Sequence, residues 1–478
     1  MTSDQPQRQP LVARSLWLAG LAVALALLAA PALWNGYPLL QYDTGGYLAR
    51  WHEGYLVPSR STVFGLYLHL GEGLHFWPMV LAQAALTVWV LTLTLRVFGL
   101  APRWRVRLAV IAALSILTTL PFLVSLLITD IFAGLSVLAL HLLVFHPRAL
   151  TRPEKIALFL VIAFAAAIHT ATLAVLLALV GAGLVGMIFT SRVISGRGLA
   201  AGAAALALGA AMLLAANVAL SGRLAWTPGG YGIMFGRMLQ DGIVARYLKD
   251  HCPDARNARA PVEQRPEALA HELKLCPYKD ELPATADEFL WSYGVFNKLG
   301  RFNGLGDEMR TIALESLVAY PGQQFTTALR ATLEQIVLVA SGAGVHDEVY
   351  HTYGIIKRFI SGEVPAMKAA RQQQSADPFR FDLINRLHQP IAWLSMLGLL
   401  FVLARLFRDR SDDLALLAVT ATLTILANAF VCGALSGPHD RYGARIVWLA
   451  TLTVMLAGLR AVVGAPAAVR HETVMASP

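Results

Sequence analysis

The residues best suited to chemistry are ionisable side chains beside apolar segments. Asp43 directly follows the first apolar segment and is the first acidic residue after Asp4. It lies among Tyr and Trp residues, which favour the headgroup layer of a membrane because one end of each ring is apolar and the other is wet. Gly45 and Gly46 allow a tight turn, which would bring Asp43 back over the helix ends. The simpler alternative is that Asp43 caps a short helix with help from Thr44.

Four more ionisable residues occupy similar positions in the chain: Asp130, His169, His439 and Arg441. Acidic and histidine side chains at membrane depth are functional candidates by default. A carboxylate can act as a general base, and the planar fork of arginine binds phosphate oxygens in pairs. Simpler alternatives are that Asp130 caps the next helix, His169 is a satisfied turn residue, and Arg441 only pairs with Asp440. Together, these residues favour lipid-linked phosphate chemistry on one membrane face.

The composition identifies a membrane protein with many spans. The chain has 478 residues, of which 56% are hydrophobic and only 14% charged. No soluble class has this balance. The net charge of +9 does not indicate a nucleic-acid partner, because the basic excess lies in short connections beside apolar segments. Such clusters mark the cytoplasmic ends of membrane spans.

Apolar windows predict the number of spans. Windows of about 17–25 residues, enough to cross a bilayer, lie at 14–33, 78–98, 107–128, 390–407, 413–435 and 445–464. Segments 131–146 and 199–220 add two more. The apolar run 156–190 is too long for one span, and dividing it at His169 places every basic cluster on the cytoplasmic side. We therefore predict an all-α protein with ten transmembrane helices and both termini in the cytoplasm.

The predicted spans divide the chain into three parts. Residues 1–220 form a membrane module with seven spans and a first outer loop at 34–78, and residues 389–478 add three spans and a cytoplasmic tail. Segment 221–388 carries 19 basic and 19 acidic residues, which suits an aqueous, mainly helical domain on the outer side.

Two of the three cysteines, Cys252 and Cys276, lie in this outer segment, and an oxidising compartment favours a disulfide between them. A zinc site formed by both cysteines with His251 and His271 is the alternative, although its spacing matches no usual ligand pattern.

The arrangement resembles the GT-C superfamily of membrane glycosyltransferases, which use polyprenyl-phosphate sugars. The resemblance consists of a long first outer loop with an acid, a run of seven spans and a large outer domain. The blocks 41–47 and 436–442 are also similar to those of uncharacterised bacterial membrane proteins. By this resemblance Asp43 is the catalytic base or orients the acceptor, and Arg441 and Arg60 hold the donor phosphate.

The resemblance also implies that the protein is located in the bacterial inner (plasma) membrane. It implies a polyprenyl-phosphate-linked sugar as donor and a glycan, lipid or protein as acceptor. Asp130 and His439 are further catalytic candidates, and Tyr47, His169 and Tyr442 are candidates for substrate binding. Several of these families carry an Asp-Glu pair, whereas Thr44 follows Asp43 here. No cofactor is therefore assigned, and the use of a divalent metal stays open.

Two other classes of protein fit the same features. A transporter or flippase for a lipid-linked saccharide or anionic solute would line its path with buried polar groups, and His169 in a broken apolar segment suits a discontinuous helix. A non-catalytic assembly protein of the envelope would use the outer domain as a docking surface. Substitution of Asp43 distinguishes the three classes: an enzyme would lose turnover but keep donor binding, a carrier would lose transport, and an assembly protein would lose little.

Overall fold

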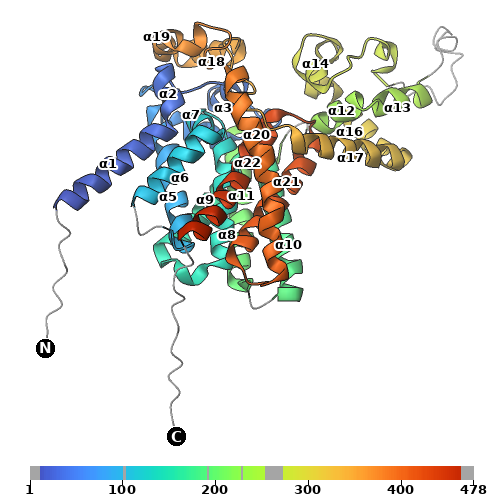
Figure 1. Cartoon of the computed structure of the whole chain (residues 1–478). Coiled ribbons are helices and arrows are strands. Elements are labelled where there is room, and N and C mark those ends of the chain that lie inside the picture. Colours follow the sequence, from blue (N-terminus) through green and yellow to red (C-terminus); the bar gives the residue numbers. More distant parts are fainter. Residues whose placement is uncertain (1–10, 101–103, 191–192, 228–229, 253–272, 464–478) are drawn as a thin grey trace, which may run out of the picture.

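The protein is helical throughout the part of the chain that the structure describes. The computed structural model describes residues 11–100, 104–190, 193–227, 230–252 and 273–463 (Figure 1). Among these residues, the only β-type pairing is an isolated parallel bridge between Leu39 and Leu126. The expected all-α class is confirmed.

In the described residues helices occupy the predicted windows, although the window 107–128 is interrupted at Thr118 and Thr119, after a helix of 14 residues. Six are long and apolar enough to cross a membrane: α5 (Trp77–Val97), α10 (Thr170–Thr190), α11 (Gly196–Ser221), α20 (Phe381–Leu403) with η7 (Ala404–Phe407), α21 (Asp413–Asn428) with the π-helix η8 (Ala429–Ala434), and α22 (Asp440–Val463). The others are α1 (Leu11–Leu28), α6 (Trp104–Leu117), α8 (Asp130–Phe145) and α9 (Arg152–Ile168). With 16 residues, α8 is about 24 Å long, which is shorter than a hydrocarbon core of about 30 Å.

The long apolar run 156–190 forms two helices, as predicted. His169 alone separates α9 from α10, and its backbone is extended with φ −152° and ψ 113°. A capping box starts α9, in which Thr151 and Glu154 each accept a hydrogen bond from the other's backbone N–H. The break places a half-buried imidazole between the ends of two apolar helices.

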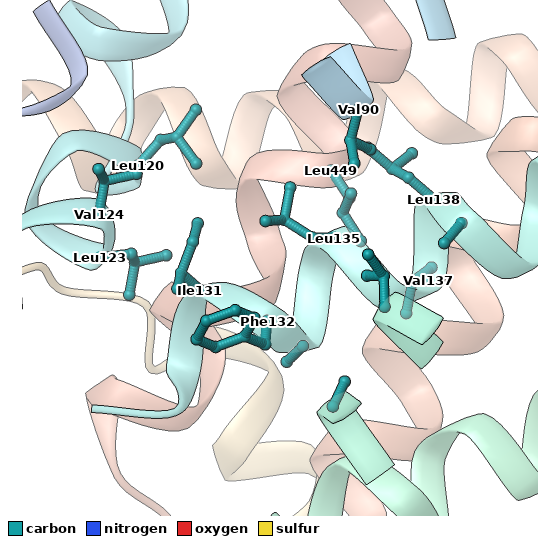
Figure 2. Close-up of a cluster of buried hydrophobic side chains, with 14 of the residues drawn as sticks. Val90, Leu120, Leu123, Val124, Ile131, Phe132, Leu135, Val137, Leu138 and Leu449 are labelled. Carbon is teal, nitrogen blue, oxygen red and sulfur yellow. The ribbon is translucent and has the colours of Figure 1, made fainter. Parts of the chain in front are cut away.

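Helix α8 lies at the centre of the main core and is buried along nearly its whole length. Figure 2 shows Ile131, Leu135 and Leu138 of α8 among side chains of α5, α22 and the short α7 (Leu120–Ser125). Gly134 lets α22 approach closely, since a Cβ there would lie 2.5 Å from the ring of Trp448. Because α8 begins at Asp130, this packing fixes a carboxylate at one end of the bundle.

The expected first outer loop, 34–78, is largely helical. It contains the end of α2 (Ala30–Asn35), then α3 (Tyr42–Glu53) and α4 (Thr62–His69). At the start of α3 the side chains of Gln41 and Thr44 form a capping box, so Thr44 takes part in the cap and Asp43 does not. Asp43 instead lies in the first helical turn, where the helix dipole favours a negative charge.

Gly45 and Gly46 lie inside α3, so the expected tight turn is wrong. A Cβ on Gly45 would lie 2.5 Å from the Cα of Thr352, and one on Gly46 would lie 2.9 Å from Nε of Arg60. The glycines are needed for close approach by other segments, and this requirement depends on tertiary contacts.

Segment 221–388 forms two parts. Helices packed around Phe235, Leu248 and Met309 have their own core. They are α12 (Tyr231–Gln240), α13 (Ile243–His251), η4 (Cys276–Tyr278), α14 (Ala286–Trp291), α15 (Val295–Lys298) and α16 (Arg301–Ala319). The predicted Cys252–Cys276 disulfide is present in this part. The cysteines therefore bond to each other, contrary to the zinc alternative, and His271 lies outside the described residues.

The second part packs onto the main bundle of apolar helices. It consists of α18 (Tyr350–Phe359), η5 (Ser361–Glu363), α19 (Val364–Ala369) and η6 (Arg371–Gln373). Ile356 and Met367 belong to the main core, and α18 packs along α3 (Figure 1). Helix α17 (Pro321–Val337) links the two parts and packs against η8. Elsewhere in the chain, the short helical turn η1 (Pro147–Ala149) lies between α8 and α9.

Candidate functional site

Asp43 is a buried carboxylate held by two arginines. Its side chain is only 8% exposed. Oδ2 accepts a hydrogen bond of 2.6 Å from Nη1 of Arg441, and Oδ1 accepts one from Nη2 of Arg60. Segments almost four hundred residues apart in the sequence therefore meet at one carboxylate. A buried ion of this kind is tolerated because its charge is compensated at hydrogen-bond distance.

Arg441, in the first turn of α22, joins both predicted carboxylates. Its Nε donates to Oδ2 of Asp130 at 2.6 Å, Nη2 reaches Oδ1 of Asp130 at 3.4 Å, and Nη1 donates to Asp43. The alternative that Arg441 pairs with Asp440 is wrong, because Asp440 instead accepts the backbone N–H of Ala340 at 2.8 Å. The planar fork of Arg441 is thus the link between α3 and α8.

Arg445 extends the network one helical turn further along α22. Its Nη1 lies 3.7 Å from Oδ1 of Asp130 and 3.1 Å from Nδ1 of His169. Nη2 also donates to Asn428 at 2.7 Å and to Sγ of Cys432 at 3.2 Å. Burial of this side chain is nearly complete, at 1% exposed.

The sequence analysis missed Arg445 as a site residue. The signal that could have found it was a charged residue four positions after Arg441, just inside a predicted span. This spacing places two side chains on one helix face.

His169 contributes an acceptor to this network. Arginine has no acceptor atom, so its contact with Nδ1 of His169 requires that nitrogen to accept. The backbone N–H of Thr172 also points to Nδ1, at 3.3 Å. Neutral His169 therefore carries its proton on Nε2. The residue predicted from the broken apolar run lies within the site, where it orients Arg445.

Arg60 approaches Asp43 from the loop before α4. Its guanidinium lies 5.8 Å from the ring centre of Tyr47 and 5.7 Å from that of Trp291. Trp291 belongs to α14, so the separately folded helical part touches the site. Such stacking favours a cation that is partly removed from water. Of the predicted substrate-binding residues, Arg60 and Tyr47 therefore lie together beside Asp43.

His439 and Tyr442 differ in their relation to the network. Tyr442 lies beside it, with Arg445 5.7 Å from its ring centre and Ser436 within 3.3 Å of its hydroxyl. His439 is half-exposed, and its Nε2 lies 3.8 Å from Asp287 of α14. The expectation that His439 joins the carboxylates is therefore not met among the described contacts. Its backbone is held by the Gln335 side chain, and its ring lies beside that of Tyr442, with ring centres 5.5 Å apart.

The charges of the network do not balance. Asp43 and Asp130 face Arg60, Arg441 and Arg445, which leaves an excess of one positive charge. A divalent cation at either carboxylate would have to displace a guanidinium group. An anion would complete the charge balance, so this arrangement suits an anionic ligand better than a metal.

Asp43 lies on α3, outside the six long apolar helices. Burial would raise the pKa of its carboxyl, but the nearby charges of Arg60 and Arg441 outweigh burial and hold that pKa below its usual value. A lowered pKa stabilises the folded state above the unfolded pKa of about 3.9, and this stabilisation is lost as the pH falls through the folded value. Asp43 is therefore ionised at neutral pH and, while paired in this way, is a weak base.

A small cavity lies next to the network. Its volume is about 20 Å³, and Arg60, His169 and Asn217 contribute to its wall. This volume holds about one water molecule. A larger ligand would have to move the segment 56–61, which forms one side of the cavity.

The site therefore combines two carboxylates, three arginines and a histidine acceptor in one buried network at the junction of α3, α8 and α22. No protein-family model, curated protein or solved structure matches this chain, so its own residues carry the functional argument.

Proposed function

We propose that this protein is an integral membrane glycosyltransferase that takes a sugar from a polyprenyl-phosphate donor. The observation that carries the proposal is the position of Arg441, which binds Asp43 and Asp130 together in a network with one excess positive charge. A polyprenyl-phosphate sugar is a phosphodiester with one negative charge. Its phosphate would neutralise the network.

In this proposal the donor phosphate binds to Arg441 and Arg60. Arginine presents paired N–H donors to phosphate oxygens. Both arginines donate to Asp43 in the structure, so a bound phosphate competes with that carboxylate for them. Asp130 keeps Arg441 in position during this exchange, which makes Asp130 a positioning residue.

Loss of its arginine partners makes Asp43 more basic when the donor is bound. The carboxylate then accepts the proton of an acceptor hydroxyl as that oxygen bonds to C1 of the sugar. The bond between C1 and the phosphate oxygen breaks, and its electron pair leaves with polyprenyl phosphate. Because ion pairs weaken Asp43 before the donor binds, activation of the acceptor is coupled to the presence of the donor.

The membrane arrangement belongs to the same proposal. α1, α6, α8 and α9 cross the bilayer with the six longer helices, which gives ten spans and cytoplasmic termini. The disulfide in the α12–α16 part supports its position in an oxidising compartment outside the inner membrane of a bacterium. The acceptor is then a glycan, lipid or protein of the envelope.

A carrier for a lipid-linked saccharide or anionic solute is the second candidate. The observation that favours it is the break at His169, where a discontinuous apolar segment places an imidazole against Arg445. Broken helices with buried polar groups form the binding sites of many transporters.

The test measures transfer and donor binding with purified protein in lipid nanodiscs. A panel of polyprenyl-phosphate pentoses and hexoses serves as donor, and envelope extract serves as acceptor. Asp43→Asn keeps the shape of the side chain but removes the base, so transfer should fall roughly 100- to 10,000-fold while donor binding persists. Asp440→Asn is the matched control because Asp440 neighbours Arg441 without joining the network.

The other outcomes identify the alternatives. Unchanged transfer by Asp43→Asn would remove this acid from the mechanism. A carrier would be identified by two results together. Wild type would move the lipid-linked sugar across a liposome membrane without transferring it to an acceptor, and Asp43→Asn would lose this movement. If cells that lack the protein have an envelope defect and the Asp43→Asn variant restores the normal envelope, the protein would be an assembly protein.

A further inference from the structure

A second group of ionisable residues lies at the far end of α3 from Asp43. It consists of His52 in the last turn of α3, His69 at the end of α4, and Glu72 just after α4. Nε2 of His52 lies 3.3 Å and Nδ1 of His69 lies 2.6 Å from the same oxygen, Oε1 of Glu72. We infer that His52, His69 and Glu72 form a binding site for Zn²⁺, with two imidazoles and one carboxylate as ligands.

One of the three separations between ligand atoms already has the value expected for tetrahedral zinc. Zinc bonds of about 2.0–2.2 Å place two ligand atoms of a tetrahedron about 3.3–3.5 Å apart. The separation of His52 from Glu72 has this value, and all three ligand atoms lie within 4.8 Å of one another. The shorter distance from His69 to Glu72 would lengthen by less than 1 Å, within the range of a side-chain rotation about χ1.

The ligands are held by packed elements. The His52 ring stacks on Phe359 of α18, with ring centres 4.9 Å apart and planes 7° apart. Nε1 of Trp51, the neighbour of His52, donates to the carbonyl of Thr62 at 2.7 Å, which fixes α3 against α4. A site preorganised on helices holds its geometry better than one on a mobile loop.

The simpler alternative is a hydrogen-bonded triad without metal. A comparison is available in the pair of His75 and Glu363, in which one imidazole lies 2.7 Å from a carboxylate that also binds backbone N–H groups and Tyr37. There, a single histidine meets a carboxylate with other partners. In the His52 group, two imidazoles lie beside one carboxylate, and together they supply the three ligands of a zinc site with an open fourth position.

The zinc site is separate from the arginine network. Asp43 and His52 are nine positions apart on α3, which corresponds to about 13.5 Å along the helix. Metal binding is therefore independent of the proposed glycosyltransferase activity. Its effect is to clamp the end of α3 to α4, and its fourth position stays open to water or a small anion.

The experiment measures metal binding by the full-length protein in detergent. The protein is stripped with a chelator, titrated with Zn²⁺ alone and assayed for bound metal by mass spectrometry. Co²⁺, whose visible spectrum reports tetrahedral coordination, serves as the spectroscopic probe. Wild type should bind one equivalent of Zn²⁺ and show the tetrahedral Co²⁺ bands.

His52→Ala, His69→Asn and Glu72→Gln each remove a ligand. Loss of outer partners alone weakens metal sites roughly 10- to 100-fold, so these variants should weaken Zn²⁺ binding by more than about 100-fold. His75→Ala, the matched control, should keep full binding and the Co²⁺ spectrum. Three variants at different positions keep the test valid if one fails to fold.

Absence of stoichiometric Zn²⁺ in wild type would overturn the inference. It would also be overturned by an octahedral Co²⁺ spectrum or by equal affinity in the folded ligand variants. The site would then be a hydrogen-bonded triad.

Discussion

At the scale of single residues, the account depends on the shape of Arg441. One guanidinium contacts two carboxylates from different helices, with donors at 2.6 Å to each. Lysine would keep the charge but would present a single ammonium that cannot bridge Asp43 and Asp130 in the same plane. Charge and geometry can therefore be separated experimentally at this position.

Arg441→Lys should weaken donor binding and slow transfer. The loss of one hydrogen bond to a charged group is worth about 1.5–3 kcal/mol, which corresponds to roughly a 10- to 100-fold lower affinity. Binding of a fluorescent polyprenyl-phosphate sugar to nanodiscs measures the effect. Arg405→Lys, at an arginine that pairs with Asp412 away from the network, should bind donor as wild type does. Wild-type affinity in Arg441→Lys would show that the paired geometry of Arg441 is not used.

Asp130→Asn should destabilise the protein, because it leaves Arg441 and Arg445 without their shared counter-charge. Breaking a buried ion pair by removing one partner costs about 3–5 kcal/mol. Thermal denaturation in detergent should show a clear decrease in melting temperature. Addition of Arg445→Gln should recover part of the loss, since it removes the uncompensated charge. Equal melting temperatures for wild type and Asp130→Asn would mean that water already solvates these arginines.

At the scale of elements, helix α3 shows how far local sequence signals reach. The sequence placed Asp43, Asp130, Arg60 and Arg441 at the ends of apolar segments, because a charge beside an apolar run is visible locally. The break at His169 was also predictable, from charge distribution and span length. The close packing around Gly45 and Gly46 was not, because it depends on Thr352 of α18, about three hundred residues further along the chain, and on Arg60.

Gly45→Ala tests this packing. Its Cβ would lie 2.5 Å from the Cα of Thr352, so α3 and α18 must separate, and both melting temperature and transfer should fall. The matched control is Gly354→Ala on α18, where nothing lies within 4 Å of the added Cβ. Alanine is favoured over glycine in a helix by about 1 kcal/mol, so the control should be neutral or slightly stabilised. Equal stability of the two variants would contradict the close approach of α3 and α18.

Side-chain direction explains the remaining differences at this scale. His439 precedes α22, which begins at Asp440, so it does not lie on the helix face that carries Arg441. Sequence proximity therefore grouped His439 with the site, whereas its imidazole lies against Asp287. Arg445, four residues after Arg441, does share the face and joins Asp130. The periodicity of the helix decides membership of the site more reliably than nearness in sequence.

At the scale of the whole molecule, the chain joins a membrane bundle to a separately packed helical part. The Cys252–Cys276 disulfide lies in that part, and the remaining cysteine, Cys432, is buried beside Arg445. The sequence predicted the disulfide from compartment and cysteine count. It did not predict that residues 350–373 leave this part and pack on the membrane module, since this division depends on which core each apolar face joins.

Replacing both bridged cysteines by alanine should destabilise the α12–α16 part. Closing a loop with a sequence separation of 24 contributes roughly 3 kcal/mol. Limited proteolysis and thermal denaturation should show earlier loss of this part. In unfolded, oxidised wild type, an alkylating reagent should modify one thiol, that of Cys432. Modification of three thiols would disprove the bridge in solution.

Reporter fusions test the proposed orientation. Fusions after Arg107 and Arg197 should report cytoplasm, because basic clusters remain on the cytoplasmic side. A fusion near Cys276 should report the outer compartment. A cytoplasmic signal there would overturn the ten-span arrangement and the shared outer face.

The most direct test of the central claim is the position of the donor phosphate. An electron cryo-microscopy structure of Asp43→Asn in nanodiscs with a polyprenyl-phosphate hexose should place phosphate oxygens about 2.7–2.9 Å from the nitrogens of Arg441, the spacing of charge-assisted hydrogen bonds. Asp130 should remain bound to Arg441, and the residue-43 side chain should face the sugar. A donor phosphate bound away from the network, with Arg441 still in contact with residue 43 and Asp130, would contradict the account.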